Sequence, residues 1–381
     1  MAPADWHERY DRWIENARLP EAAVKREAYG AQVGTDGFLL LDALKQPSTP
    51  AELTALPAVA VLRRVWARHY ERITSGAGSA GNSGISAVRL RTLRGHRKAG
   101  KPGDGIVSPY DRDARFRARS GREWFGYVAH LTETCDEDAP RLVVHTDTTD
   151  ASVHEAMRVA PIHAALAAKG LAPAQHLAHA AYMSGDLLVS AREQHGIDLI
   201  GPQHRNTSWQ GTADDAFDIS DFTVDWDQQV VRCSEGKGSA AWASYCNKQR
   251  PHRSALVRVR FRPADCRACP SRLRCTRTTP TRGRNLILYP RREHEALMAA
   301  RARETTGDYR KLYAQRQGIE STMSQGVRAF GLRRARYRGL AKTKLQHVAT
   351  AAAMNLDRMA AWFTKRPIAP TRTSRFAVLA A

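Results

Sequence analysis

The sequence predicts an α/β protein, and three observations support that fold class. Apolar and polar residues alternate over residues 124–134 and 141–146, and a helical pattern follows over residues 153–169. Short strand patterns interleaved with cysteines occupy residues 203–290, and helical spacing returns from residue 291 onward. Strands followed by a helix are typical of an α/β unit, so we interpret the later segments as an inserted β-rich subdomain and the helical C-terminal part of the core.

Two segments are predicted to precede this core. Residues 1–74 are interpreted as a helical region, with breaks at Leu19-Pro20 and Gly34 and with apolar residues at helical spacing from Pro57 to Tyr70. Residues 75–108 consist mainly of Gly, Ser, Arg and Lys with almost no large apolar side chain. That composition predicts a flexible linker.

The core is predicted in two parts, with the β-rich subdomain between them. The first part, residues 109–202, continues after its first helix with a short segment at 177–182, a helix at 185–195 and a buried strand at 197–201. The subdomain, residues 203–290, has strand patterns at 222–226, 229–233, 255–261 and 285–289. Residues 291–363 hold helical stretches, the last of them marked by Leu345, Val348, Ala352, Leu356 and Met359, and residues 364–381 are a tail.

The positive charge of the chain is confined to its last third. Residues 251–381 carry 29 Lys and Arg against 7 Asp and Glu, whereas residues 1–250 carry 30 against 31. This asymmetry is expected of a surface that binds the phosphate backbone of a nucleic acid. A solvated basic surface is the simpler alternative. A membrane-surface role fits less well, because the basic residues do not lie on a short amphipathic helix.

The remaining composition narrows the class of protein. At 381 residues with 43% hydrophobic residues, the chain is long enough to bury a sizeable core. It has no signal-like N-terminus and no apolar stretch of bilayer-spanning length, which predicts a cytoplasmic, nucleoid-associated protein without a membrane partner. Its six unevenly placed cysteines indicate reduced thiols rather than a disulfide framework.

Four of these cysteines are candidate zinc ligands. Cys266, Cys269 and Cys275 form a C-x2-C-x5-C pattern, and Cys233 at the end of a predicted strand is available as the fourth ligand. Tetrahedral zinc takes four such ligands, so a structural zinc site is one hypothesis. Unliganded cysteines in a small β subdomain are an equally good interpretation, because Cys246 competes with Cys233 for the fourth position.

A possible catalytic face and a basic segment follow each other in the helical C-terminal part. Tyr313, Arg316 and Glu320 are spaced by three and four residues, which places them on one face of a predicted helix. Taken alone, this pattern is that of a surface ion pair. The segment after it carries basic residues interleaved with Tyr337, a composition suited to DNA phosphates and an adjoining sugar or base. The predicted DNA-binding residues are Arg328, Arg333, Arg334, Arg336, Arg338, Lys342 and Lys344.

Further motifs accompany these residues. They are Ser324-Gln-Gly-Val-Arg328, the Gly331–Gly339 run, Leu345-Gln-His-Val-Ala349 through Asn355–Arg358, the Cys266–Cys275 segment, Ser108–Arg115 and Gly126–Thr134. Together with Tyr313-x-x-Arg316-x-x-x-Glu320, they resemble the bacterial insertion-sequence transposases of the DDE class. The resemblance implies an RNase H-like core, terminal inverted repeats and target DNA as partners, and two Mg²⁺ ions that three carboxylates hold for in-line displacement at phosphate.

The resemblance also assigns roles and exposes departures. Glu320 corresponds to the last carboxylate, a Mg²⁺ ligand, and Tyr313 and Arg316 would position the scissile phosphate. In the family that this sequence resembles, the second carboxylate is the Asp of a D-x-x-Y pattern. His179 occupies that position in this sequence, and imidazole is a poor Mg²⁺ ligand. No strand that could carry the first aspartate precedes the helical region, so we expect either a truncated, degenerate copy without the opening strand or a mis-called start codon. Asp147 and Asp150 are interpreted as N-caps of the following helix rather than as replacements.

The functional prediction is a transposase by descent that retains DNA binding and has lost strand cleavage and transfer. The alternative is a non-catalytic DNA-binding protein that occupies inverted repeats or inhibits an active transposase. A zinc-containing RNA-binding protein would explain the charge and the cysteines, but it leaves the Tyr313–Glu320 motif unexplained. A homo-oligomer is a further expectation.

Overall fold

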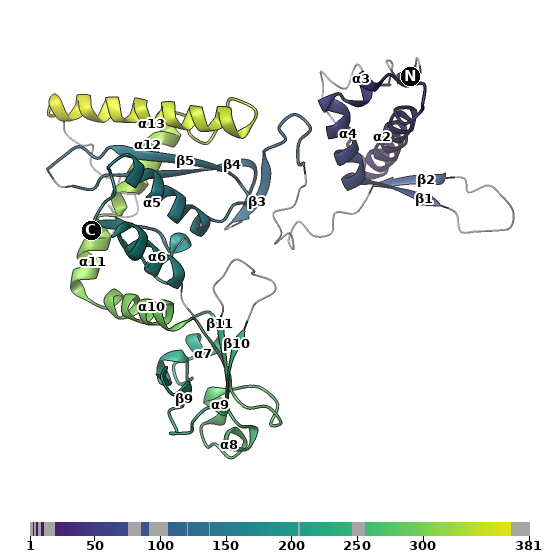
Figure 1. Ribbon diagram of the computed structural model, residues 1–381. Helices are drawn as coiled ribbons and strands as arrows, with labels where there is room; N and C mark the ends of the chain where they lie inside the picture. The colour runs from purple at the N-terminus through teal and green to yellow at the C-terminus, as the bar shows by residue number, and fades with distance from the viewer. Residues whose placement is uncertain are drawn as a thin grey trace. The chain divides into compact units, whose positions relative to one another are not determined.

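The computed structural model describes residues 20–74, 85–90, 106–119, 121–136, 138–204, 206–245 and 256–366, together with positions 3, 5, 6, 9 and 10. Contacts divide the chain into two compact units. One comprises residues 1–129, 148–153 and 334–347, and the other comprises residues 130–147, 154–333 and 348–381. Helices and small sheets alternate along the chain (Figure 1), which confirms the predicted α/β class.

The N-terminal helical region ends in a β-hairpin. Helices α2 (Ala23–Ala43), α3 (Ala51–Thr54) and α4 (Pro57–His69) precede the antiparallel strands β1 (Tyr70–Thr74) and β2 (Ile85–Leu90). The predicted break at Gly34 is wrong, because α2 runs through it. A β-carbon at Gly34 would lie 2.5 Å from the ring of Tyr70 in β1, so this glycine lets that ring pack closely against α2. The linker prediction is wrong for β2, and residues 75–84 and 91–105 lie outside the described residues.

The main sheet of the core has the order β3-β4-β5. Its strands are β3 (Arg115–Arg119), β4 (Arg122–Glu133) and β5 (Val143–Asp150), and β3 pairs antiparallel with β4. Strands β4 and β5 confirm the alternation seen in the sequence. Strand β3 was not predicted, because its five residues include three arginines and offer little apolar alternation.

The first part of the core continues with helices and a parallel strand pair. A 3-10 turn, η2 (Glu155–Arg158), leads into α5 (Val159–Ala168), and β6 (Gln175–Leu177) is followed by a second such turn, η3 (Ala180–Tyr182). Helix α6 (Gly185–His195) then leads into β7 (Asp198–Ile200), which pairs parallel with β6. Val159, Met183, Ile197 and Leu199 are buried together here. The helices and the strand expected in this region are confirmed.

Short strands occupy the described residues of the segment for which the sequence predicts an inserted subdomain. Antiparallel strands β8 (Thr223–Asp225) and β9 (Val230–Arg232) form one pair, and β10 (Ala241–Tyr245), β11 (Leu256–Arg260) and β12 (Asn285–Leu288) form a sheet in that order. The short helices α7 (Trp209–Thr212), α8 (Pro263–Arg267) and α9 (Arg272–Cys275) flank them. A separate apolar cluster stabilises this subdomain, formed by Phe222, Val231, Val259, Phe261, Leu286 and Leu288.

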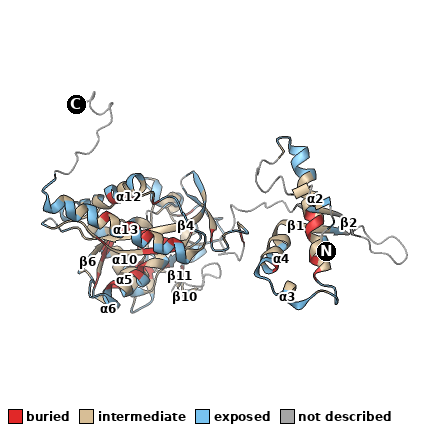
Figure 2. Ribbon diagram, turned by 90° about the horizontal axis from the view of Figure 1, so that it is seen from above, coloured by how far each residue is buried: buried red, intermediate tan, exposed pale blue. Residues whose placement is uncertain are grey.

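The C-terminal part consists of α10 (Arg291–Glu304), α11 (Gly307–Ala314), α12 (Gln317–Ala329) and α13 (Leu340–Phe363). The apolar stripe of α13 that its spacing marks does not form the buried face, because Leu345, Val348, Leu356 and Met359 are exposed. Figure 2 colours α13 and the other elements by burial. Thr343, His347, Thr350 and Met354 are buried instead. Among the helices of the described residues, none combines the length and the apolar character needed to cross a bilayer.

Candidate active-site face and basic segment

A buried ionic network fixes helix α12, which carries Glu320. The guanidinium of Arg358 donates to Glu133 Oε2 at 3.1 Å, to Thr322 Oγ1 at 2.6 Å and to the carbonyl oxygen of Arg141 at 2.7 Å. Thr322 is fully buried, and its hydroxyl also donates to Glu133. The end of β4, helix α12 and helix α13 are thereby held together. Sequence reasoning missed Glu133 and Thr322, because nothing local in the sequence indicates that they meet Arg358.

The side chain of Asn355 fixes α13 to strand β5. Its Oδ1 accepts from the backbone N–H of Val143 at 2.8 Å, and its Nδ2 donates to the carbonyl oxygen of the same residue at 2.9 Å. The amide therefore satisfies the backbone of Val143 in the way a neighbouring strand would. This contact explains why an asparagine stands at this position of the helix.

Tyr313, Arg316 and Glu320 come together although they are not on one continuous helix. Tyr313 lies in α11, Glu320 lies in α12, and the turn between the two helices contains Arg316, so the single predicted helix is wrong. Arg316 Nη2 nevertheless donates to Glu320 Oε1 at 3.0 Å, and its guanidinium lies 5.5 Å from the centre of the Tyr313 ring. The Arg316 side chain is mostly buried, and that of Glu320 is 66% exposed. The Glu320 carboxylate is therefore exposed to solvent beside the guanidinium of Arg316, with which it is paired.

The structure also brings Tyr313 next to the segment of His179. The Tyr313 hydroxyl donates to the carbonyl oxygen of Ala178 at 3.4 Å, and burial is the main cause that raises the pKa of this tyrosine. Its ring stacks on Tyr309 with 5.5 Å between the ring centres. One tyrosine therefore connects the helical face of Glu320 to the residue beside His179.

His179 performs a structural task at the start of η3. Its ring Nδ1 accepts from the backbone N–H of Ala181 at 3.2 Å, so the imidazole caps this short helix. At the other end of η3, the hydroxyl of Tyr182 shares a hydrogen bond of 2.7 Å with Nδ1 of His130. A carboxylate would cap the same position, because side-chain oxygens of Asp are preferred there. The imidazole keeps this capping function and lacks the charge that a Mg²⁺ ion requires.

The carboxylates of this region do not fit a two-metal site. In the part of the chain that the structure describes, no group of three or more His, Cys, Asp or Glu is arranged to hold a metal ion. Glu320 is bound to Arg316, and Asp147 lies within β5, where its Oδ2 accepts from Arg158 Nε at 2.6 Å. The N-cap interpretation of Asp147 and Asp150 is wrong, because His154 caps η2 and Asp150 accepts from Ser152 in a local turn.

The four predicted zinc ligands belong to the β-rich segment. Burial raises the pKa of the Cys275 thiol, the nearby Arg284 guanidinium lowers it, and the thiols of Cys266, Cys269 and Cys233 raise it, so these groups are close neighbours. Cys266 Sγ accepts from the backbone N–H of Arg284 at 3.3 Å. Three of the thiols pack against the apolar cluster. Cys246 lies outside the described residues.

The basic segment presents its side chains to solvent. Arg328, Arg333, Arg334, Arg336, Arg338, Lys342 and Lys344 are all exposed. Gln346 holds the backbone of the segment at two points: its Oε1 accepts from Arg336 N at 2.8 Å, and its Nε2 donates to the carbonyl oxygen of Arg334 at 2.7 Å. The arginines are therefore displayed from a fixed backbone, as binding to a regular array of phosphates requires.

Comparison with known proteins adds one finding. Residues 232–360, which include most of the strands of the subdomain, helices α10 to α12, the basic segment and most of α13, match the family model described as a transposase DDE domain. No curated protein and no solved structure matches the chain.

Proposed function

Residues 232–360 belong to the family of transposase DDE domains, and on this premise we propose that the chain is a transposase copy that binds DNA and no longer cuts it. The observation that carries the proposal is the pair formed by His179 and Glu320. At the face where Tyr313 contacts the His179 segment, one candidate metal ligand is an imidazole and the other is bound to Arg316.

DDE domains use Mg²⁺ to activate a water or a DNA 3′-hydroxyl and to stabilise the leaving oxygen. The residues described here do not supply the cluster of carboxylates that holds such ions. Arg316 can still bind a phosphate, because a guanidinium matches two phosphate oxygens. The face is therefore suited to holding DNA rather than to hydrolysing it.

Two further parts of the proposal are an RNase H-like core and DNA binding, and each has structural support. An RNase H-like core is supported by the order of a three-stranded sheet, a helix, and a parallel strand pair around a second helix. DNA binding is supported by the seven exposed basic residues of the C-terminal part and by its excess of positive charge.

The loss of cleavage is tested by incubating the protein and Mg²⁺ with duplex DNA from the flanks of the gene, labelled on both strands. We expect no Mg²⁺-dependent nicking or strand transfer above the level of Glu320→Ala, because a single carboxylate does not hold two metal ions. Nicking by the wild type that Glu320→Ala abolishes would overturn the proposal, since it would mean that other carboxylates complete the site.

DNA binding is tested separately, by fluorescence anisotropy of a labelled duplex over a range of salt concentrations. Each phosphate contact contributes about 0.9 to the slope of log affinity against log salt. We expect a steep slope, which becomes shallower by about 3 when Arg333, Arg334 and Arg336 are all changed to Gln. Affinity that is independent of salt would contradict the electrostatic interface.

A further inference from the structure

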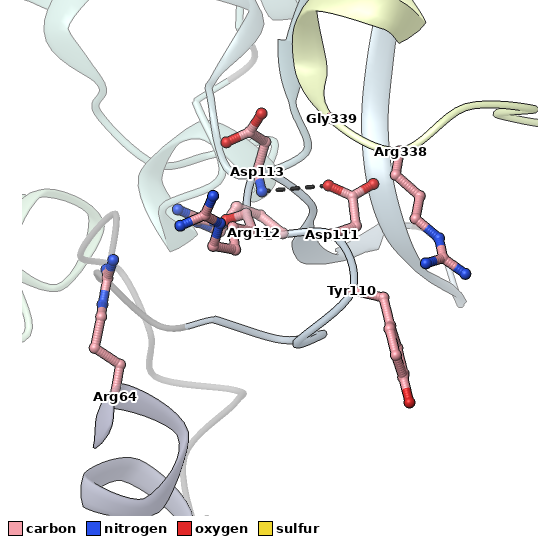
Figure 3. A pocket seen from close by; sticks show the side chains of 8 residues that line it. Arg64, Tyr110, Asp111, Arg112, Asp113, Arg338 and Gly339 are labelled. Carbon is pink, nitrogen blue, oxygen red and sulfur yellow. Dashed lines mark hydrogen bonds between the residues drawn. The ribbon is translucent and has the colours of Figure 1, made fainter. Parts of the chain in front are cut away.

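The loop before β3 and the end of the basic segment line a shared open pocket (Figure 3). Its volume is about 500 Å³, and Tyr110, Asp111, Arg112, Asp113, Arg115, Arg338 and Gly339 lie along it. The loop belongs to a motif, Ser108–Arg115, to which the proposed function gives no role. Its residues stand in the part of the sequence that has no net positive charge, so charge counting does not reveal them.

Two aspartates hold the loop and the basic segment in place. Asp113 Oδ2 accepts from the backbone N–H of Leu340, the first residue of α13, at 2.9 Å. Asp111 Oδ1 accepts from the Tyr127 hydroxyl at 2.6 Å and from two backbone N–H groups of its own loop. A carboxylate at the start of a long helix is also favoured by the helix dipole. Both aspartates therefore have structural partners.

Arg112, Arg115 and Arg338 form no ion pair with a carboxylate among the described residues. Arg115 Nη1 donates to the carbonyl oxygens of Arg112 and Ala114, at 2.6 and 2.9 Å. Arg338 lies over the Tyr110 ring at 5.0 Å, and that ring is 69% exposed. Guanidinium groups beside an exposed aromatic ring suit a phosphodiester, because the guanidinium binds phosphate oxygens and the ring packs on the adjoining sugar or base.

We propose that this pocket binds one phosphodiester group of duplex DNA, with Arg112, Arg115 and Arg338 as the phosphate ligands and Tyr110 as the aromatic contact. The inference rests on the proposed DNA-binding function and extends its interface to the loop before β3. Asp113 is a positioning residue, since it holds the start of α13 against the loop while carrying a charge that repels phosphate.

The first test compares the double variant Arg112→Gln/Arg115→Gln with Arg282→Gln in the full chain. The probe is a labelled DNA duplex, and the readouts are affinity and its salt slope. We expect the double variant to weaken binding by about tenfold and to reduce the slope by about 1, because one phosphate contact is lost. Arg282 is an exposed arginine outside the pocket, so its variant should bind within about twofold of wild type.

The second test uses Asp113→Ala, for which charge and positioning predict opposite results. Removing a negative charge near phosphate would by itself tighten binding. If Asp113 holds the pocket together, binding becomes weaker instead. Thermal unfolding of the variant verifies that the protein remains folded, and tighter or unchanged binding by a folded Asp113→Ala variant would overturn its positioning role.

The outcomes separate this inference from the proposed function. If the wild type does not bind duplex DNA, both fail together. If neutralising Arg333, Arg334 and Arg336 weakens binding while the Arg112/Arg115 double variant behaves like Arg282→Gln, the pocket inference alone is wrong. If single-stranded RNA binds the wild type and duplex DNA does not displace it, the ligand class proposed for the pocket is wrong as well.

Discussion

At the scale of single residues, the capping role of His179 can be tested by substitution. The imidazole caps η3 through Nδ1, as a carboxylate would. We therefore expect His179→Asp to fold with nearly unchanged stability, because aspartate is a preferred capping side chain. His179→Ala should lower the free energy of unfolding by about 0.5–1 kcal/mol, because the N–H of Ala181 loses its partner. Urea denaturation of both variants measures this, and a larger loss for Asp than for Ala would contradict the capping role.

A hydrogen-bonded histidine pair predicts a loss of stability in acid. His163 Nε2 and His176 Nδ1 share a hydrogen bond of 2.9 Å, and His163 is fully buried. Burial and, to a smaller extent, the neighbouring His176 and His195 lower the pKa of His163 to about 4. Burial also lowers the pKa of His176 to about 4. Both side chains therefore stay neutral in the folded protein at pH values where the unfolded chain is already protonated.

The sign of the pH effect follows from these lowered pKa values. Because the unfolded state binds more protons below its pKa of about 6.5, stability is fully present above that pH. It is lost as the pH falls from about 6.5 towards 4, and we expect a loss of about 2–4 kcal/mol between pH 7 and pH 5. Urea denaturation at several pH values measures it. His163→Leu/His176→Leu should flatten this profile, and an equally steep profile for that double variant would assign the effect to other groups.

At the scale of elements, local patterns predicted the helices and strands better than they predicted which faces are buried. The alternation in β4 and the helical pattern of α6 were sufficient, because both depend on neighbouring residues. In α13 the apolar stripe through Leu345 and Leu356 indicated a helix, yet the buried face contains Thr343 and His347. His347 Nδ1 is hydrogen-bonded to the hydroxyl of Thr148 at 2.8 Å, so polar pairing between distant segments decides this face. The spacing of apolar residues along one helix cannot reveal such a contact between distant segments.

The ionic network between elements gives the sharpest stability prediction. Arg358→Ala leaves the carboxylate of Glu133, 7% exposed, without its positive partner. We expect a loss of about 3–5 kcal/mol in the free energy of unfolding, because an unpaired buried charge is costly. Arg366 is the matched control: it pairs with Asp357 at 3.0 Å, with both side chains largely exposed, so Arg366→Ala should cost less than about 1 kcal/mol. Equal losses for the two variants in urea denaturation would contradict the network.

Zinc binding by the subdomain stays a prediction of the sequence. The thiols of Cys233, Cys266, Cys269 and Cys275 are neighbours, although the described residues do not form a metal-holding group. If zinc draws them together, purified wild type should contain about one more zinc ion per chain than Cys269→Ser. Elemental analysis measures this difference. Equal metal content would leave the thiols as packed side chains of the apolar cluster.

At the scale of the whole molecule, the sequence indicates the basic part of the chain more directly than it indicates the pocket. A charge excess is a property of composition, and it is visible without a fold. The pocket around Arg338 is different, because the hydrogen bond from Leu340 to Asp113 joins residues that are far apart in the chain. The same holds for the approach of Tyr313 to Ala178. Such sites depend on tertiary contacts, which a single sequence does not specify.

A protein that binds transposon DNA without cutting it should interfere with one that does. We expect an excess of this chain to lower the transposition frequency of an active transposase that acts on the same DNA ends, because occupied phosphates exclude a second protein. Glu320→Ala should inhibit as strongly as wild type, since inhibition requires no chemistry. The Arg333, Arg334 and Arg336 triple Gln variant should inhibit less, in proportion to its lost affinity. A transposition assay with graded expression of each variant measures this order, and inhibition that survives the triple variant would point to contact between the proteins instead of competition for DNA.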